Sequence, residues 1–222
     1  MSLRQTVKYN QYRGHSLVTA PTVVPISVDE LIAYLKLGDN DEGVQLSMMI
    51  DSVVAYCERY LGIAFITQTW RLTLDQFPTQ GEPWWDGVRD AHINVLVNES
   101  RASEIFLPRH PLISVDSMTA DSAAVVIADI FIVDTQQQKG RLVLKYGAVL
   151  PVVVNETANG VVIDYTAGFG ATAALVPADL RLGLLQFAGY LYSNRGDGCS
   201  AESAFKKSGA KGVMDSYKVM DL

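Results

Sequence analysis

A glycine-rich stretch near the C-terminal end carries the pattern most often linked to chemistry. Gly168-Phe169-Gly170-Ala171-Thr172-Ala173 follows an apolar run and matches G-x-G-x-x-A, the phosphate-binding turn of dinucleotide sites. Such a site needs a helix that begins inside the motif, so that its amino end faces the pyrophosphate. Here Pro177 predicts a helix that begins several residues later. We therefore interpret the stretch as a strand-to-helix turn and predict no cofactor.

The histidines and cysteines do not form a recognisable reactive set. His15, His92 and His110 lack the spacing of metal ligands, and Cys57 and Cys199 are too distant to form a metal knuckle. The chain has no G-x-S-x-G, H-E-x-x-H or Walker A motif. We predict a protein that is not an enzyme, with no catalytic residues and no metal. An enzyme site assembled from distant residues such as His92 and His110 is one alternative.

Two adjacent tryptophans supply the other alternative. Trp84 and Trp85 lie in a loop-like stretch, GEPWWDG, and could stack on a sugar or a base. A nucleic-acid platform would have basic neighbours, whereas Glu82, Asp86 and Asp90 surround this pair. Packing or a subunit contact explains the pair better. The competing function is a small-ligand or carbohydrate-binding module that uses the Trp84/Trp85 loop.

The elements that must position these residues begin with two helices. Ser27 and Glu30 form a capping box, which predicts a helix from Val28 that is closed by Gly38. A second helix is predicted from a cap at Asn40 or Asp41 to Leu61, and Gly62 ends it. Its apolar stripe has helical spacing: Leu46, Met49, Ile50, Val53, Cys57, Tyr60 and Leu61.

After Gly62 the apolar period changes from helical to alternating. Short strands are predicted in residues 65–77, 92–97, 103–107, 113–119, 125–133, 141–146 and 160–165. No helical pattern separates these strands, so a parallel sheet is improbable. The fold class is α+β: a helical core of two N-terminal helices and one C-terminal helix, with an inserted antiparallel sheet or small barrel.

The C-terminal helix is predicted over about 178–194 and is apolar on nearly every side. A helix of this kind is buried all round, and a chain this small was expected to cover only part of it. We therefore predict that another copy of the protein covers the rest. The subunit-interface residues in this hypothesis are Leu182, Leu185, Gly189 and Tyr192.

The predicted domain organisation has four parts. Residues 1–25 form an extended N-terminal arm, 26–62 and 175–197 the helical core, 63–174 the inserted β subdomain, and 198–222 a flexible C-terminal segment. Glycines, serines and balanced charge make independent folding of that last segment improbable. Its apolar residues fit a segment that becomes ordered on a partner.

The net charge of the chain indicates which classes of partner the protein can bind. The formal net charge of its 222 residues is −6, which argues against tight binding to phosphate backbones. A negative net charge does not argue against a protein that DNA must slide past without binding. We predict no membrane partner, because no apolar run is long enough to span a bilayer. Synthesis in the cytoplasm is expected.

The order of these features resembles the head–tail connector (adaptor) family of tailed bacteriophages, which also occurs in prophages and gene transfer agents. The resemblance covers about residues 26–197. It rests on the helix pair that ends in ERYLGIAFITQTW, followed by LPRHPLISVDSM, KGRLVLKYG, VVIDYTAGFG and VPADLRLGLLQFAGYLYSNRG.

This resemblance implies a non-enzymatic virion protein at the head–tail junction, made in a bacterial cytoplasm. It implies a homo-oligomeric ring, usually of twelve subunits, that joins the portal protein of the DNA-packaging vertex to a stopper or tail-completion protein. DNA passes through the ring's channel without sequence-specific binding. In such proteins the C-terminal segment reaches toward the portal, so the portal-docking residues in this hypothesis are Phe205, Lys206, Lys207 and Tyr217.

Overall fold

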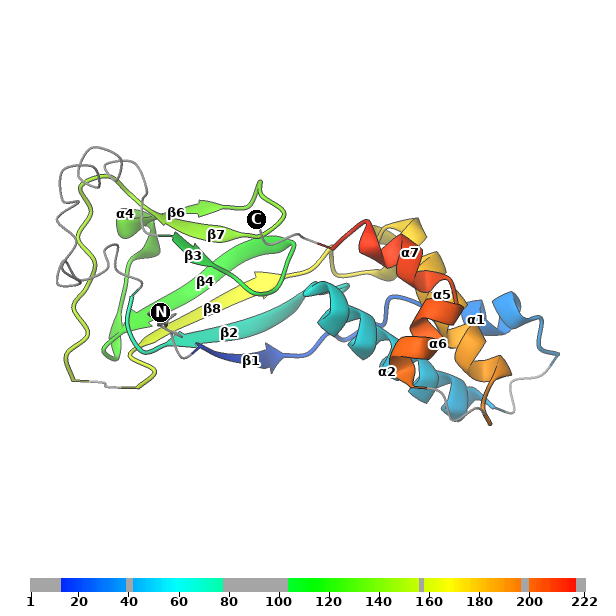
Figure 1. Ribbon diagram of the computed structural model, residues 1–222. Helices are drawn as coiled ribbons and strands as arrows, with labels where there is room; N and C mark the ends of the chain where they lie inside the picture. The colour runs from blue at the N-terminus through cyan, green and yellow to red at the C-terminus, as the bar shows by residue number, and fades with distance from the viewer. Residues whose placement is uncertain (1–12, 39–41, 78–103, 156–157, 197–199, 219–222) are drawn as a thin grey trace, which may run out of the picture. The chain divides into compact units, whose positions relative to one another are not determined.

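The computed structural model describes residues 13–38, 42–77, 104–155, 158–196 and 200–218 (Figure 1). These residues form two compact units, each described by itself below. The sheet unit contains residues 13–18, 69–77, 104–108, 112–155 and 158–166. The helical unit contains residues 19–38, 42–68, 109–111, 167–196 and 200–218. Residues 63–68 and 167–174, predicted to belong to the β subdomain, therefore lie in the helical unit.

The sheet unit has two sheets, which confirms the α+β class. The five-stranded sheet has the order β1-β2-β8-β4-β5, and the three-stranded sheet has the order β3-β7-β6. Strands β3 and β7, β4 and β5, and β6 and β7 pair antiparallel. The described strands form open sheets rather than the alternative small barrel. Their bounds are β1 Arg13–Thr19, β2 Gln68–Leu74, β3 Glu104–Phe106, β4 Leu112–Ala120, β5 Ala123–Ala124, β6 Phe131–Asp134, β7 Arg141–Leu144 and β8 Val161–Ala167.

Strand β8 shows how the sequence pattern selects a face. Its buried residues alternate with half-buried ones along the whole strand, as expected where successive side chains point to opposite faces. The buried set is Val161, Ile163, Tyr165 and Ala167. The three-stranded sheet approaches the five-stranded one closely, because a Cβ added at Gly140 would lie 2.3 Å from the Cβ of Leu112. Between the sheets lies an apolar core.

One predicted strand is wrong. Residues 125–133 contain the short helix α4, Ile127–Ile130, between β5 and β6. The run VVIADIFIV is apolar almost throughout, and such a run does not by itself distinguish a strand from a helix. Its last three residues, 131–133, do form a strand as the start of β6. The strand predicted over 92–97 lies outside the described residues.

The helical unit begins as the sequence predicts. Helix α1, Val28–Leu35, has its capping box in place: Ser27 Oγ accepts from the Glu30 amide at 3.1 Å, and Glu30 Oε2 accepts from the Ser27 amide at 2.9 Å. Helix α2, Gly43–Leu61, ends at Gly62 in the left-handed conformation with φ of 70°. Helix α1 ends earlier than predicted, because Lys36 rather than Gly38 adopts the left-handed turn.

The C-terminal part of the unit differs from the prediction. After the 3-10 helix Ala173–Leu175 and helix α5, Ala178–Ser193, the chain forms α6, Ala201–Lys207, and α7, Ala210–Asp215. The expected flexible segment is therefore helical over 201–215. Although this segment is polar overall, four of its apolar residues are buried in the core of the unit: Ala204, Phe205, Ala210 and Met214.

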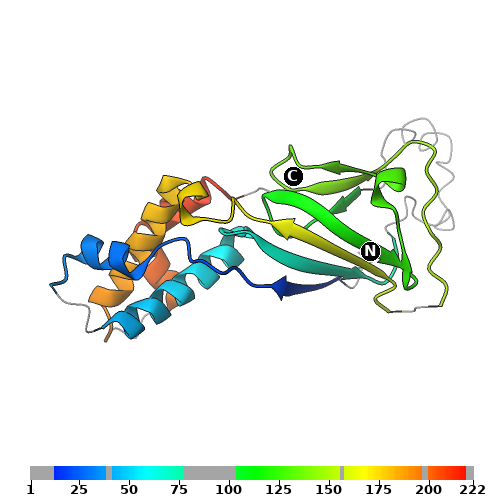
Figure 2. The ribbon, with the colours of Figure 1, turned by 180° about the vertical axis from the view of Figure 1, so that it is seen from behind.

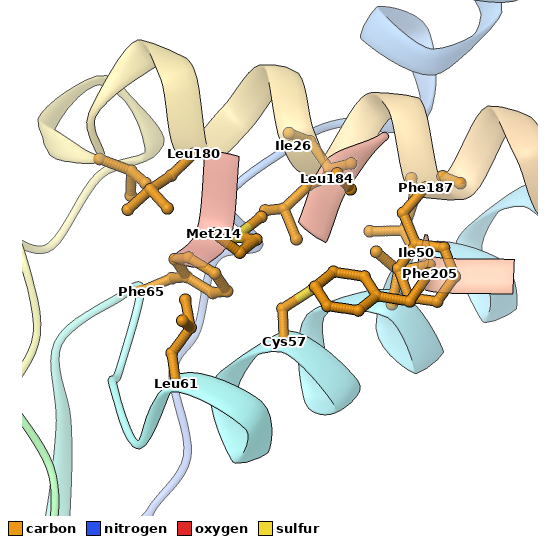
Figure 3. Close-up of a cluster of buried hydrophobic side chains, with 14 of the residues drawn as sticks. Ile26, Ile50, Cys57, Leu61, Phe65, Leu180, Leu184, Phe187, Phe205 and Met214 are labelled. Carbon is orange, nitrogen blue, oxygen red and sulfur yellow. The ribbon is translucent and has the colours of Figure 1, made fainter. Parts of the chain in front are cut away.

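All five helices contribute to one apolar core (Figure 3). The close-up shows Leu180, Leu184 and Phe187 of α5 directed at side chains of α2, α6 and α7. Residues 63–66 also belong to this core, which explains why they do not continue strand β2. No helix in the described part of the chain has the length and apolarity needed to cross a membrane.

Candidate assembly surfaces

Helix α5 is covered by its own chain. It contacts α1, α2, α6 and α7, and its buried residues lie on several sides of the helix: Leu180, Gly183, Leu184, Phe187, Ala188 and Gly189. The apolar character all round α5 therefore needs no second copy to explain it. Our argument that a neighbour must cover this helix was wrong, because it treated residues 198–222 as unable to contribute to the core.

The four interface residues predicted on α5 have different environments. Leu182 is 46% exposed, whereas Leu185 is half-buried against the core. Gly189 is buried, and a Cβ added there would lie 3.0 Å from the ring of Tyr34 in α1. The Arg195 guanidinium lies over the Tyr192 ring, with its Cζ 4.2 Å from the centre of that ring. Of the four, Leu182 is the residue most open to a partner.

The predicted portal-docking residues are likewise divided. The Phe205 ring is buried, with its centre 5.0–5.3 Å from those of Tyr56, Tyr60 and Phe187. The hydroxyl of Tyr217 donates to the Asp179 carboxylate of α5. In this structure Phe205 and Tyr217 both make intramolecular contacts, and their part in portal docking stays a prediction.

Two lysines complete the predicted set. Lys206 and Lys207 are exposed on α6, and Lys206 pairs with Glu202 one helical turn away. An exposed pair of this type contributes little to stability. These two residues stay a hypothesis for partner contact.

The glycine turn is a backbone joint within the helical unit. Gly168 has φ of +141°, and a Cβ there would lie 2.7 Å from the carbonyl carbon of Ile66. The Gly168 amide donates to the carbonyl of Pro111 at 2.9 Å, and the Thr67 amide donates to that of Gly170 at 3.0 Å. Helix α5 begins only at Ala178. The turn therefore joins three chain segments instead of presenting its amides to a phosphate.

A half-buried carboxylate stabilises the same joint, and sequence reasoning missed it. Glu58 Oε1 accepts from the Phe65 amide and from Gln68 Nε2, both at 2.9 Å. Arg109 Nη1 donates to the carbonyl oxygens of Glu58 at 2.6 Å and Ile63 at 3.0 Å. Burial raises the pKa of Glu58. These bonds tie the end of α2 to the segments after it, which is a structural role.

The other candidate reactive residues are dispersed. His15 in β1 stacks on Trp70 with ring centres 4.4 Å apart, and its Nε2 lies 2.9 Å from the Tyr165 hydroxyl. His110 is buried in the helical unit. His92, Trp84 and Trp85 lie outside the described residues, so the alternatives built on them stay untested. Among the described residues no three His, Cys, Asp or Glu side chains are placed to hold a metal.

The polar face of the five-stranded sheet pairs its charges internally. Arg71 on β2 donates to both oxygens of Asp164 on β8, at 2.7 and 2.9 Å. Ser117 on β4 also donates to Asp164, and Thr166 donates to Asp116 at 2.6 Å. Both carboxylates thus accept hydrogen bonds from neighbouring strands, which stabilises the sheet.

One surface that sequence reasoning missed is strongly exposed. Residues 146–154, YGAVLPVVV, follow β7 in the sheet unit without a single charge. Their largest exposed side chains are Tyr146 at 105%, Val149 at 82%, Val152 at 76% and Val154 at 72%. We name this segment the valine strap. Its sequence signal is nine uncharged, mostly apolar residues, of which only Tyr146 belongs to a predicted strand.

Known proteins resemble the chain in fold. No protein-family model and no curated protein sequence matches it. A chain in the virion of a native gene transfer agent (GTA) particle matches with TM-score 0.69 and 21% identity over 94% of this chain and 96% of that chain. A chain in the neck of an empty GTA particle, computed with C6 symmetry, matches with TM-score 0.70 and 21% identity over 94% and 97%.

A third match is a chain in the neck of a native GTA particle, computed with C12 symmetry. Its TM-score is 0.65 and its identity 19%, over 94% of this chain and 97% of that chain. At these identities the likeness establishes the fold. The resemblance to the head–tail connector family in gene transfer agents is thus confirmed at the level of the fold.

Proposed function

We propose that this protein is a non-enzymatic structural component of the neck of a phage-like particle, located at the head–tail junction. The observation that carries the proposal is the fold likeness to neck chains over nearly the full length of both proteins. A fold alone does not fix a function, but no competing site is evident among the described residues. The polar side chains discussed above serve packing and hydrogen bonding.

In the finer form of the proposal, identical subunits form a ring, twelve in the virion, that joins the portal to a stopper or tail-completion protein. DNA passes through the channel without sequence-specific binding. The C6 and C12 symmetries of the similar neck structures support a closed ring. The acidic balance of the chain, −6 overall, supports a channel that does not hold DNA.

Deleting the coding sequence from the genetic element that carries it tests this function. We expect heads that contain DNA but lack tails, and restoration of tailed particles by the gene supplied in trans. Electron microscopy of purified particles distinguishes these forms. Tailed particles produced at the normal level without the gene would contradict the proposal.

A further inference from the structure

The sheet unit carries two exposed apolar segments, one in a loop and one on an edge strand of its five-stranded sheet. One is the valine strap, and the other is the C-terminal half of strand β1 (Figures 1 and 2). The helical unit, by contrast, directs most of its large apolar side chains into its core. Single apolar side chains are also exposed elsewhere in the sheet unit, among them Val126 at 63% and Ile132 at 53%. The two segments differ from these in being continuous uncharged runs, which makes them candidates for contact with a partner.

The valine strap is held at both of its ends. Before it, the Lys145 amide donates to the carbonyl of Ile130 at 2.9 Å, and its ammonium donates to that of Ala128. After it, the amide of Asn155 donates to the Asp121 carboxylate at 3.0 Å. The strap is thus tied down on both sides, and three of its four valines, Val149, Val152 and Val154, are exposed between these ties.

The second end of the strap fixes its place in the sheet. Asp121 lies in the turn between β4 and β5, and β5 is the last strand in the order of the five-stranded sheet. The Asp121 amide also donates to the carbonyl of Gly160 at 2.8 Å, just before β8. The strap therefore ends beside the β4–β5 turn and the start of β8, at one end of the strands.

Strand β1 lies at the opposite edge of that sheet. Its first half is fixed: a Cβ added at Gly14 would lie 2.2 Å from Thr73 Oγ1, and His15 stacks on Trp70. Its second half is open, with Leu17 43% and Val18 49% exposed. Consecutive residues of a strand point to opposite faces, so neither face is covered at this point. An edge strand left open in this way is a site for pairing with another chain.

Charge decides which partner fits these two segments. The chain carries −6 overall, so two copies repel each other except where both surfaces are neutral. The strap has no charged residue, and neither does the run from Ser16 to Val28 that includes the open half of β1. Both are rich in β-branched residues, which pack well against extended backbone.

We propose that the valine strap of one copy packs on Leu17 and Val18 of the next copy. Because the two segments are different parts of the chain, the contact is head-to-tail. Such a contact closes into a ring when the rotation between copies divides the circle. This inference rests on the proposed ring: it assigns the surfaces through which the copies meet, and it moves them from α5 to the sheet unit.

Site-specific crosslinking in assembled particles tests the pairing. The background is Cys199→Ser, while Cys57 is kept, because it is buried and burial raises the pKa of its thiol to about 12. Leu17→Cys and Val152→Cys are introduced singly and together, supplied in trans to the deletion strain, and treated with a short bismaleimide. Denaturing gels and mass spectrometry identify the products.

The double variant is expected to give a ladder of covalent multimers, and co-expressed single variants are expected to give a dimer only. Each single variant alone stays monomeric. The matched control pairs Val152→Cys with Leu182→Cys, which is exposed in the helical unit and should give no ladder.

Several results would overturn the pairing. A dimer from Val152→Cys alone would mean a symmetric strap-to-strap contact. A crosslink to another particle protein would mean a different partner, and a crosslink within one chain would mean an intramolecular contact. Particles that contain the chain without any crosslink would overturn the pairing but leave the neck function standing. Absence of the chain from particles would overturn both.

Discussion

Helix α5 and the valine strap are both apolar, yet they have opposite environments. Helix α5 is covered by four other helices of its own chain, whereas Val149, Val152 and Val154 of the strap are more than two-thirds exposed. The sequence of α5 looked too apolar for a monomer, and the strap attracted no notice. Apolarity by itself therefore does not mark an interface. What matters is whether the same chain supplies the covering residues.

The substitution with the largest expected effect on stability tests whether α6 buries part of helix α5. Phe205→Ala removes a ring that is packed between Tyr56, Tyr60 and Phe187, so we expect a loss of about 3–5 kcal/mol in the free energy of unfolding. Val152→Ala, the matched change in the strap, should alter it by less than about 0.5 kcal/mol. Urea denaturation monitored by circular dichroism measures both. Similar losses for the two variants would contradict the comparison.

A smaller loss is expected at the joint that leads into α5. Gly168→Ala forces a side chain into the left-handed region and into the backbone of Ile66, which should cost about 2–3 kcal/mol. Gly38→Ala is the control, since nothing lies within 4 Å of its added Cβ and its φ is not positive. Thermal unfolding compares the two. If Gly168→Ala were as stable as the control, the joint would not need its glycine.

The cap of α1 should have an effect of about 1 kcal/mol. Ser27→Ala removes the acceptor for the Glu30 amide, and α1 is the helix that covers Gly189 of α5. Ser47→Ala, at an exposed position within α2, serves as the control. Denaturation of both variants gives the difference. No loss for Ser27→Ala relative to Ser47→Ala would mean that the capping box does not hold α1 in place.

The smallest effect concerns pH. Because burial raises the pKa of Glu58, its contribution to stability is fully present below the pKa of the unfolded carboxyl and is lost as pH rises through the folded pKa. Glu58→Gln keeps an oxygen that can accept from Phe65 and Gln68 but removes the titration. From about pH 4.3 upward, wild type should lose stability relative to the variant. A difference that is constant between acidic and neutral pH would contradict this.

Much of the fold could be predicted from residues that are close together in the sequence. The capping box at Ser27, the end of α2 at Gly62 and the alternation in β8 each depend on residues close together in the chain. The strand-to-helix turn at Gly168 was also predicted, because Pro177 separates the motif from the helix.

Which apolar residues are buried and which are exposed could not be predicted from the sequence in the same way. Phe205 lies in a segment of polar composition, and its burial depends on rings of α2 and α5 that are distant in sequence. Gly189 reads as an interface residue until α1 is placed over it. Nor does the strap's exposure follow from its composition, because nine apolar residues fit a buried strand equally well. Whether an apolar residue is buried depends on tertiary contacts with residues that are distant in sequence.

Assembly of two charged variants is the most direct test of the claim that copies meet through the sheet unit. Val152→Asp and Leu182→Asp each place a carboxylate at an exposed apolar position, one on the strap and the other on α5. Both should fold normally. Supplied in trans to the deletion strain, Leu182→Asp should restore tailed particles, and Val152→Asp should leave heads without tails. Restoration by Val152→Asp and failure of Leu182→Asp would contradict the account and return the interface to α5.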